Sequence, residues 1–106
     1  MQAATRGAAE VPLEVAEAAL ALYERLVQLE SITATSMISD LRVARAMALA
    51  SARGALENVA INLVSITDGE YTGRMRRKVA ALESQISKYS AASIPEESGA
   101  PTGGIR

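Results

Sequence analysis

The sequence predicts an all-α protein, with three main helices packed as a bundle of long helices and a disordered C-terminal tail. Three observations support this fold class. Apolar residues recur at helical spacing in three successive segments. The chain is 49% hydrophobic but its only aromatic residues are three Tyr, so the core must consist of Ala, Leu, Ile and Val, which suits closely packed helices. A length of 106 residues provides one core and no second domain.

The first helix is expected from about Glu10 to Ile32. Its apolar residues recur every three or four positions, and acidic residues collect on the narrower remaining face. Pro12 either lies in the first turn of this helix or kinks a longer helix that begins near Gln2, and the sequence leaves both interpretations open. One wide side of the helix is expected to be buried, with a central stripe and apolar residues that flank it. The stripe is Val15, Ala19, Leu22, Leu26 and Leu29, and the flanking residues are Leu13, Ala16, Leu20, Tyr23 and Val27.

The segment 31–40, SITATSMISD, interrupts the helical pattern because Ser and Thr favour turns and caps. Ser39 or Asp40 is then expected to cap a second helix that runs to about Ile66. One face of this helix is an ordinary core stripe and the opposite face is small or polar, so we expect it to be buried on both sides. The small or polar face carries Ala44, Ala48, Ser51, Ala55, Asn58, Asn62 and Ser65.

The third helix is expected to start at the sequence TDGE, from Thr67 to Glu70, which matches a capping box. Residues after about Ser90 are rich in Pro, Gly and Ser, which predicts disorder. We therefore divide the chain into a helical segment, 1–90, and a disordered tail, 91–106. The expected apolar stripe of the third helix is Tyr71, Met75, Val79, Leu82, Ile86 and Tyr89.

The composition excludes several kinds of chemistry. The chain has no Cys and no His, which excludes disulfides, thiolate metal sites, a cysteine nucleophile and the usual base near neutral pH. A net charge of −1 gives no overall attraction to nucleic acid or to an anionic membrane. No apolar run is long enough to span a bilayer and no signal-peptide pattern is present, so we expect a cytoplasmic protein. The basic run RMRRK, 74–78, is interpreted as a solvated helix face because no aromatic residues alternate with the charges.

Asn58 and Asn62 lie one helical turn apart among apolar neighbours. A buried amide needs a hydrogen-bond partner, and the spacing supports an interhelical network and a ligand contact about equally. Asp40 could act as an acid or base, but helix capping is the favoured role. The sequence contains no catalytic triad, no close carboxylate pair and no metal-binding cluster.

Two stretches and their spacing resemble the cyclodeaminase/cyclohydrolase family, the helical domain of formiminotransferase-cyclodeaminase and of the related methenyltetrahydrofolate cyclohydrolase. The stretches are AAEVPLEVAEAAL, 8–20, and ISDLRVARAMALASARGALENVAINLVSITDGEY, 38–71. The matching elements are a VPLEVAE helix, SD at the start of the next helix, an Ala/Gly-rich middle, and two Asn with INL and a following Asp. Their order and spacing over about two-thirds of the chain make the resemblance specific.

The resemblance implies an all-α fold of long helices, self-association, and a tetrahydrofolate derivative as substrate. Family members close a formimino group on tetrahydrofolate into the methenyl bridge with loss of ammonia, or hydrolyse that bridge to the formyl form. The sequence does not distinguish the two reactions. Neither reaction needs a metal, a thiolate or a histidine, so no metal cofactor is expected.

The chain corresponds to the C-terminal half of the family domain. The upstream half carries a PGGG turn and the acidic helix with the proton-donor carboxylate, and this sequence contains neither. No catalytic residue is therefore carried over, and the chain alone is expected to be inactive. Its expected partners are a reduced folate and either further copies of itself or a separate N-terminal-half chain, with no nucleic acid and no membrane.

Only Ser39, Asp40, Asn58 and Asn62 fall on positions where the family has the same residue types, and we expect them to line a pocket or an interface. The preceding loop, usually Gly-Asn-x-Asn in the family, here reads TATS, 33–36, so its contribution to a pocket is not expected. The rival interpretation is a non-catalytic helical module that self-associates through its Ala/Asn face. Such a module would form an oligomer without affinity for folate.

Overall fold

The computed structural model describes the backbone of residues 2–93 and the side chains of residues 7–91. No strand occurs in this part of the chain, which confirms the predicted all-α class. None of the described helices combines the length and the hydropathy needed to cross a bilayer. The elements are α1 (Gln2–Leu29), the 3-10 helices η1 (Glu30–Ile32) and η2 (Thr35–Met37), α2 (Ile38–Leu63) and α3 (Gly69–Ser93).

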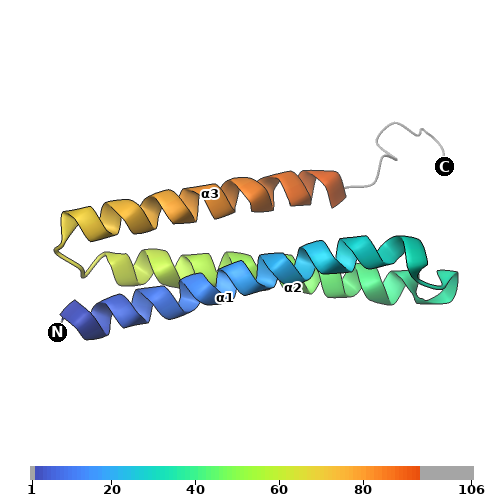
Figure 1. Ribbon diagram of the computed structural model, residues 1–106, viewed down its shortest axis with the longest axis horizontal. Helices are drawn as coiled ribbons and strands as arrows, with labels where there is room; N and C mark the ends of the chain where they lie inside the picture. Colours follow the sequence, from blue (N-terminus) through green and yellow to red (C-terminus); the bar gives the residue numbers. More distant parts are fainter. Residues whose placement is uncertain (1, 94–106) are drawn as a thin grey trace.

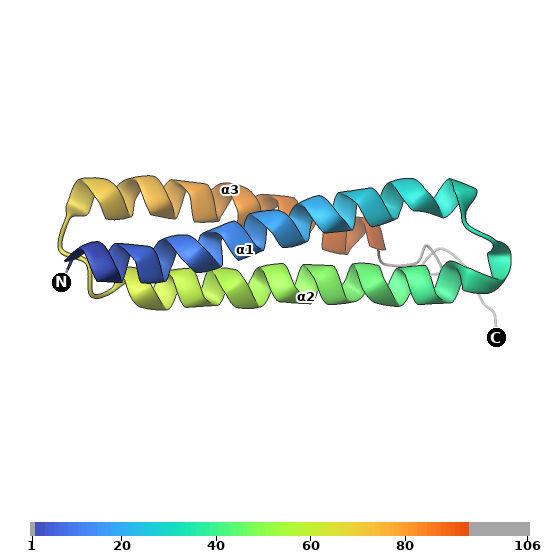
Figure 2. The same cartoon turned by 60° about the horizontal axis from the view of Figure 1, so that its bottom comes forward.

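The three helices form an elongated bundle of about 57 × 27 × 16 Å. Helices α1 and α3 run in one direction and α2 runs in the opposite direction (Figure 1). Most contacts between helices join α1 and α2, which cross obliquely, and α3 lies along one side of this pair (Figure 2). The two helices approach closely because their contact surface is rich in small buried side chains, namely Ala9, Ala16, Ala48, Ala52 and Ala55.

The core stripes predicted for the second and third helices are confirmed. On α2 and the turn after it, every member of the expected stripe is buried: Leu49, Ala52, Leu56, Val59, Leu63 and Ile66. On α3 the buried members are Tyr71, Met75, Val79 and Ile86, while Leu82 and Tyr89 are partly buried and pack against the core.

The stripe predicted for α1 is wrong at three of its five positions. Val15, Leu22 and Leu29 are 48%, 50% and 43% exposed, respectively. The apolar surface of α1 extends around too much of the helix to be covered from one side, and α2 and α3 both pack on the same side of it. The side chains that α1 buries are therefore Ala9, Leu13, Ala16, Leu20 and Tyr23, with Ala19 and Leu26 partly buried. Four of the five predicted flanking residues are thus in the core, and the fifth, Val27, is 42% exposed.

Helix α1 starts at Gln2, so the longer of the two predicted helices, with Pro12 inside it, is the observed one. It ends at Leu29 rather than Ile32 because the chain tightens into η1. The hydroxyl of Thr33 donates a hydrogen bond to the carbonyl of Leu29, which satisfies one of the free carbonyls at the helix end.

The predicted capping of α2 by Ser39 or Asp40 is wrong. Helix α2 begins at Ile38, with Met37 as its N-cap and no capping side-chain hydrogen bond. The physical reason is η2, which leads directly into α2 and places both predicted caps inside the first turn. Asp40 still stabilises the helix from there, because a negative charge near the N-terminus interacts favourably with the helix dipole.

Helix α3 is capped one residue later than predicted, by Asp68 instead of Thr67. The Oδ1 atom of Asp68 accepts hydrogen bonds from the backbone N–H groups of Glu70 and Tyr71, both at 3.1 Å. Asp is at least as good an N-cap as Thr, so the local competition favours the carboxylate. At the other end, 91–93 continue α3, and the rest of the predicted disordered tail lies outside the described residues.

Candidate functional site

The four residues that the sequence nominates all lie on α2 but do not form one site. Ser39 and Asp40 are exposed in the first turn, whereas Asn58 and Asn62 lie in the last two turns. At about 1.5 Å per residue, Asp40 and Asn58 are separated by about 27 Å along the helix axis. The structure brings the two Asn residues together and leaves Ser39 and Asp40 at the opposite end.

Asn62 joins α2 to α1 through its side chain. Its Nδ2 atom donates to the carbonyl oxygen of Ala8 at 3.2 Å and to that of Asn58 at 2.8 Å. Pro12 explains why Ala8 accepts this bond, because a proline has no N–H to donate to the carbonyl four residues earlier. Of the two roles that the spacing allows, the structure therefore shows an interhelical hydrogen bond for Asn62.

The small or polar face of α2 is only partly covered in this chain. Ala48 and Ala55 are buried against α1, whereas Ser51, Asn58 and Ser65 are exposed. The expected burial on both sides is thus not observed, because no described helix lies against this part of α2. The side chain of Asn58 faces solvent.

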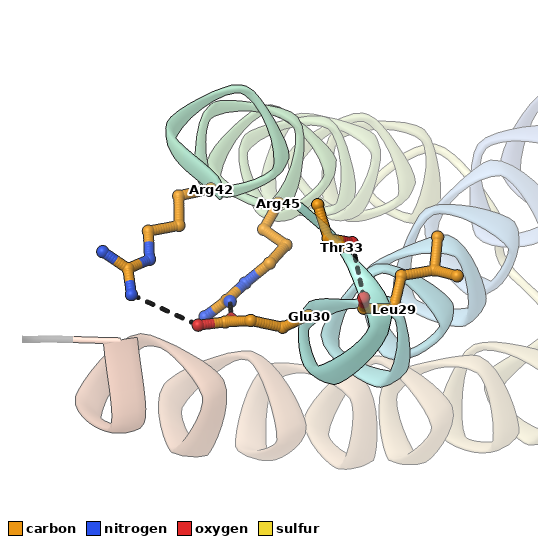
Figure 3. Close-up of polar contacts among 5 residues, drawn as sticks. All are labelled: Leu29, Glu30, Thr33, Arg42 and Arg45. Atoms are coloured by element: carbon orange, nitrogen blue, oxygen red, sulfur yellow. Dashed lines mark hydrogen bonds and ion pairs between the residues drawn. The ribbon is translucent and has the colours of Figure 1, made fainter. Parts of the chain in front are cut away.

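A polar cluster that the sequence did not indicate lies where α1 turns into α2 (Figure 3). Glu30 accepts a hydrogen bond from Arg42 at 3.2 Å with one carboxylate oxygen and a hydrogen bond from Arg45 with the other. The hydrogen bond from Arg42 is the largest effect on the Glu30 carboxyl, and together with the charge of Arg45 it holds the pKa below its usual range.

Arg45 had one signal in the sequence. It is a charged residue in helical phase with Leu49 and Ala52, the core stripe of α2. A charge at such a position needs a partner, and the structure supplies Glu30. The side chain of Arg45 is only 17% exposed, and its Nε atom is buried without a hydrogen-bond partner among the described residues.

Two tyrosines from opposite ends of the chain meet beside this cluster. The rings of Tyr23 on α1 and Tyr89 on α3 stack with centroids 4.6 Å apart and planes inclined by 28°. The guanidinium carbon of Arg45 lies 5.8 Å from the centre of the Tyr23 ring, within range of a cation–π interaction. Tyr89 donates a hydrogen bond to Glu24, which raises the pKa of the phenol because the bond favours its protonated form, and burial adds to this effect.

A hollow of about 450 Å³ opens beside the tyrosine pair. It combines apolar and aromatic walls with one carboxylate, one amide and one guanidinium, the pattern typical of small-molecule sites. We name this feature the tyrosine hollow, and its lining residues are Tyr23, Glu24, Val27, Gln28, Arg45 and Tyr89.

The basic half of α3 faces the acidic strip of α1 instead of facing solvent alone. The Tyr71 hydroxyl donates to Glu10 at 2.9 Å, and Arg74 lies over the Tyr71 ring at 5.8 Å. A groove between α1 and α3 is lined by these opposite charges, so part of the basic charge is offset within the chain. This favours a structural role for the basic run RMRRK, 74–78. The charged residues along the groove are Glu10, Glu14, Glu17, Arg74 and Lys78.

The described residues include no group of three or more His, Cys, Asp or Glu side chains arranged to hold a metal ion. In a comparison with protein families, the family model described as formiminotransferase-cyclodeaminase matches residues 1–81. Searches of curated proteins and of solved structures found no match. The family match spans α1, α2 and the first half of α3, which includes both Asn residues and most of the tyrosine hollow. The chain therefore belongs to the formiminotransferase-cyclodeaminase family.

Proposed function

We propose that this chain forms part of a reduced-folate site in a domain of the formiminotetrahydrofolate cyclodeaminase or methenyltetrahydrofolate cyclohydrolase type. The observation that carries the proposal is the family match over residues 1–81. The substrate would be a tetrahydrofolate derivative in one-carbon metabolism. Both reactions move a proton at a nitrogen atom or at water, so the site needs an acid or base and groups that hold the ring system.

The tyrosine hollow is the feature of this chain best suited to the ring system of such a ligand. Its volume of about 450 Å³ lies within the range of roughly 300–1,000 Å³ that is usual for ligand pockets. The apolar surfaces of Val27 and Tyr89 would contact the ring, while Glu24 would accept hydrogen bonds from ring amino groups. The guanidinium group of Arg45, which lines the hollow, would donate to a ligand acceptor.

A complete reaction site would require a further chain. Glu24 is the only carboxylate that lines the tyrosine hollow, and it already accepts the hydroxyl of Tyr89. We therefore propose that the proton donor comes from a partner, either a separate N-terminal-half chain or another copy, and that this chain alone is inactive. Asn58 and Asn62 would then belong to an interface and not to the pocket itself.

Binding can be tested by isothermal titration of the full chain with methenyltetrahydrofolate. We expect Arg45→Gln to weaken binding about tenfold, because it removes one charge-assisted contact. Arg42→Gln is the matched control, since Arg42 also pairs with Glu30 but does not line the hollow. Equal effects of the two substitutions would contradict the assignment of the hollow, and no binding by the unmodified chain would contradict the folate site.

Activity is followed separately by the loss of the methenyl absorbance, with and without an added chain that carries the N-terminal half of the family domain. The proposal requires turnover only in the mixture. The alternative function is a non-catalytic helical module, and an assembled chain with no folate affinity in either condition would support it.

A further inference from the structure

Two recognition groups of the tyrosine hollow are already occupied by a side chain of the same chain. Tyr89 stacks on the ring of Tyr23, and the Tyr23 side chain is only 3% exposed. The hydroxyl of Tyr89 also donates a hydrogen bond to Glu24, the only carboxylate that lines the hollow. A ligand in the hollow therefore cannot stack on Tyr23, and it competes with Tyr89 for Glu24.

Of the two side chains that contact the Tyr23 ring, Tyr89 is the easier one to displace. Arg45 lies 5.8 Å from the ring centre, is 17% exposed and pairs with Glu30. Breaking this pair would leave a largely buried charge without its partner, which is strongly unfavourable. Tyr89 is uncharged and half-buried, and the groups that it leaves on moving are an aromatic ring and the carboxylate of Glu24, which a ligand can satisfy.

The end of α3 that carries Tyr89 is weakly anchored. Ile86 is the last buried side chain of α3, and none of residues 87–91 is buried. The helix continues to Ser93, about two turns further, and it stops short of the turn that joins α1 and α2 (Figures 1 and 2). Arg53 of α2 donates a hydrogen bond to Ser90 at an exposed position. Helix ends with few buried apolar contacts open at a low free energy, so this end can move while the rest of α3 stays packed.

We propose that Tyr89 is a gate on the tyrosine hollow and that the structure shows its closed form. When a ligand enters, the last two turns of α3 shift away from α1, and the ligand replaces Tyr89 on the ring of Tyr23 and at Glu24. The identity of the ligand rests on the proposed function: a reduced folate has a ring system that can stack and N–H groups that can donate. The family match ends at residue 81, so the resemblance assigns no role to Tyr89.

The gate lowers the apparent affinity of the site for its ligand. Only the open fraction of the chain binds, so the apparent dissociation constant is the intrinsic one divided by that fraction. The hydrogen bond from Tyr89 to Glu24 alone favours the closed form by about two- to tenfold, and the stacking on Tyr23 adds to this. Weakening either contact should therefore tighten ligand binding, whereas the loss of a residue that only holds the ligand would weaken it.

Titration of the full chain with methenyltetrahydrofolate tests this sign. Tyr89→Phe keeps the ring but removes the bond to Glu24, and we expect binding to tighten by about two- to tenfold. Tyr71→Phe is the matched control, because it removes the bond from Tyr71 to Glu10, another tyrosine–glutamate contact between α3 and α1, away from the hollow. It should leave the affinity unchanged. An unchanged or weaker affinity of Tyr89→Phe, or an equal gain with Tyr71→Phe, would overturn the gate.

A covalent lock tests whether the end of α3 has to move. Arg53 and Ser90 join α2 to this end of α3, and neither residue lines the hollow. Because the chain has no cysteine, Arg53→Cys and Ser90→Cys can be combined in one chain and bridged by a short bismaleimide without background. The bridged chain should bind methenyltetrahydrofolate at least about tenfold more weakly than the same chain before bridging. Equal affinities before and after bridging would show that α3 does not open.

Fluorine NMR of the chain labelled with 3-fluorotyrosine tests the gate without any ligand. The chain has three tyrosines, so each gives one assignable resonance. Relaxation dispersion should show a common microsecond-to-millisecond exchange for Tyr23 and Tyr89 and none for Tyr71. Absence of this exchange, or the same exchange at all three tyrosines, would refute the gate. A chain that shows it but binds no methenyltetrahydrofolate would retain the gate and refute the folate site, so the two failures are distinguishable.

Discussion

The hydrogen bond from Asn62 to the carbonyl of Ala8 exists because Pro12 supplies no N–H to that carbonyl, so the two positions should be energetically coupled. Asn62→Ala removes the donor and leaves the carbonyl of Ala8, an exposed residue, to water. The lost bond is worth about 0.5–1.5 kcal/mol, and the better helix propensity of alanine returns about 0.6 kcal/mol. We therefore expect a net loss of at most about 1 kcal/mol.

The same substitution should cost much less when Pro12→Ala is already present. The backbone N–H that Pro12→Ala introduces can donate to Ala8 as in any regular helix turn. The propensity gain at position 62 is the same in both backgrounds and cancels in a double-mutant cycle, which leaves a coupling free energy of about 1 kcal/mol. Pro12→Ala alone should raise the stability, because a proline in a helix interior is unfavourable.

The assay is urea unfolding followed by far-UV circular dichroism, with all four chains at one protein concentration. Asn58→Ala is the matched control. It makes the same change one turn away, at an exposed side chain, and should show no coupling to Pro12. A coupling below about 0.3 kcal/mol for Asn62, within the usual error of additivity, would refute the reasoning.

Three further predictions concern the cap of α3 and the two shifted pKa values. Asp68→Ala should lower the free energy of unfolding, measured in urea, by about 1 kcal/mol, whereas Thr67→Ala should change it by less than about 0.5 kcal/mol. A larger loss with Thr67→Ala than with Asp68→Ala would show that Thr67 is the cap, as the sequence predicted. The folded-state pKa of Tyr89 is raised, so its contribution to stability is present below about pH 10 and is lost as the pH rises through that pKa. Tyr89→Phe should therefore flatten the decline of the melting temperature at alkaline pH, and an unchanged decline would argue against the bond to Glu24. The pKa of Glu30 is lowered from 4.5, so its contribution is present above that pH and is lost as the pH falls through the folded-state pKa. Glu30→Gln should reduce the loss of stability below pH 4.5, measured by thermal unfolding across an acid series.

Helical periodicity predicted most of the fold because the apolar stripes of α2 and α3 are covered by other helices of the same chain. The interpretation of α1 failed at Val15 and Leu22 for a physical reason. Periodicity shows how wide an apolar face is, but it does not show whether the chain itself covers that face. The predicted cap of α3 failed by one residue because Thr67 and Asp68 compete for the same backbone N–H groups. The predicted cap of α2 failed because η2 leads directly into that helix.

The candidate site was less predictable because its main contact joins residues far apart in the sequence. Tyr23 and Tyr89 meet only through the packing of α3 on α1, and no local spacing indicates that contact. The bond from Asn62 to Ala8 could be predicted in part from the sequence. Pro12 inside a helix implies a free carbonyl at Ala8, so the sequence indicates that a donor is needed, while the fold determines that α2 supplies it.

The tyrosine hollow and the bond from Asn62 to Ala8 lie at opposite ends of the α1–α2 pair. Tyr23 and Arg45 are near the turn that joins the two helices, whereas Ala8 and Asn62 are near their other ends. A change at one place should therefore leave the other unaffected. Arg45→Gln should weaken binding of methenyltetrahydrofolate without changing the coupling between Asn62 and Pro12. Asn62→Ala should lower stability without weakening folate binding, and a loss of folate binding in Asn62→Ala would show that the ligand contacts this end of α2 and not the hollow.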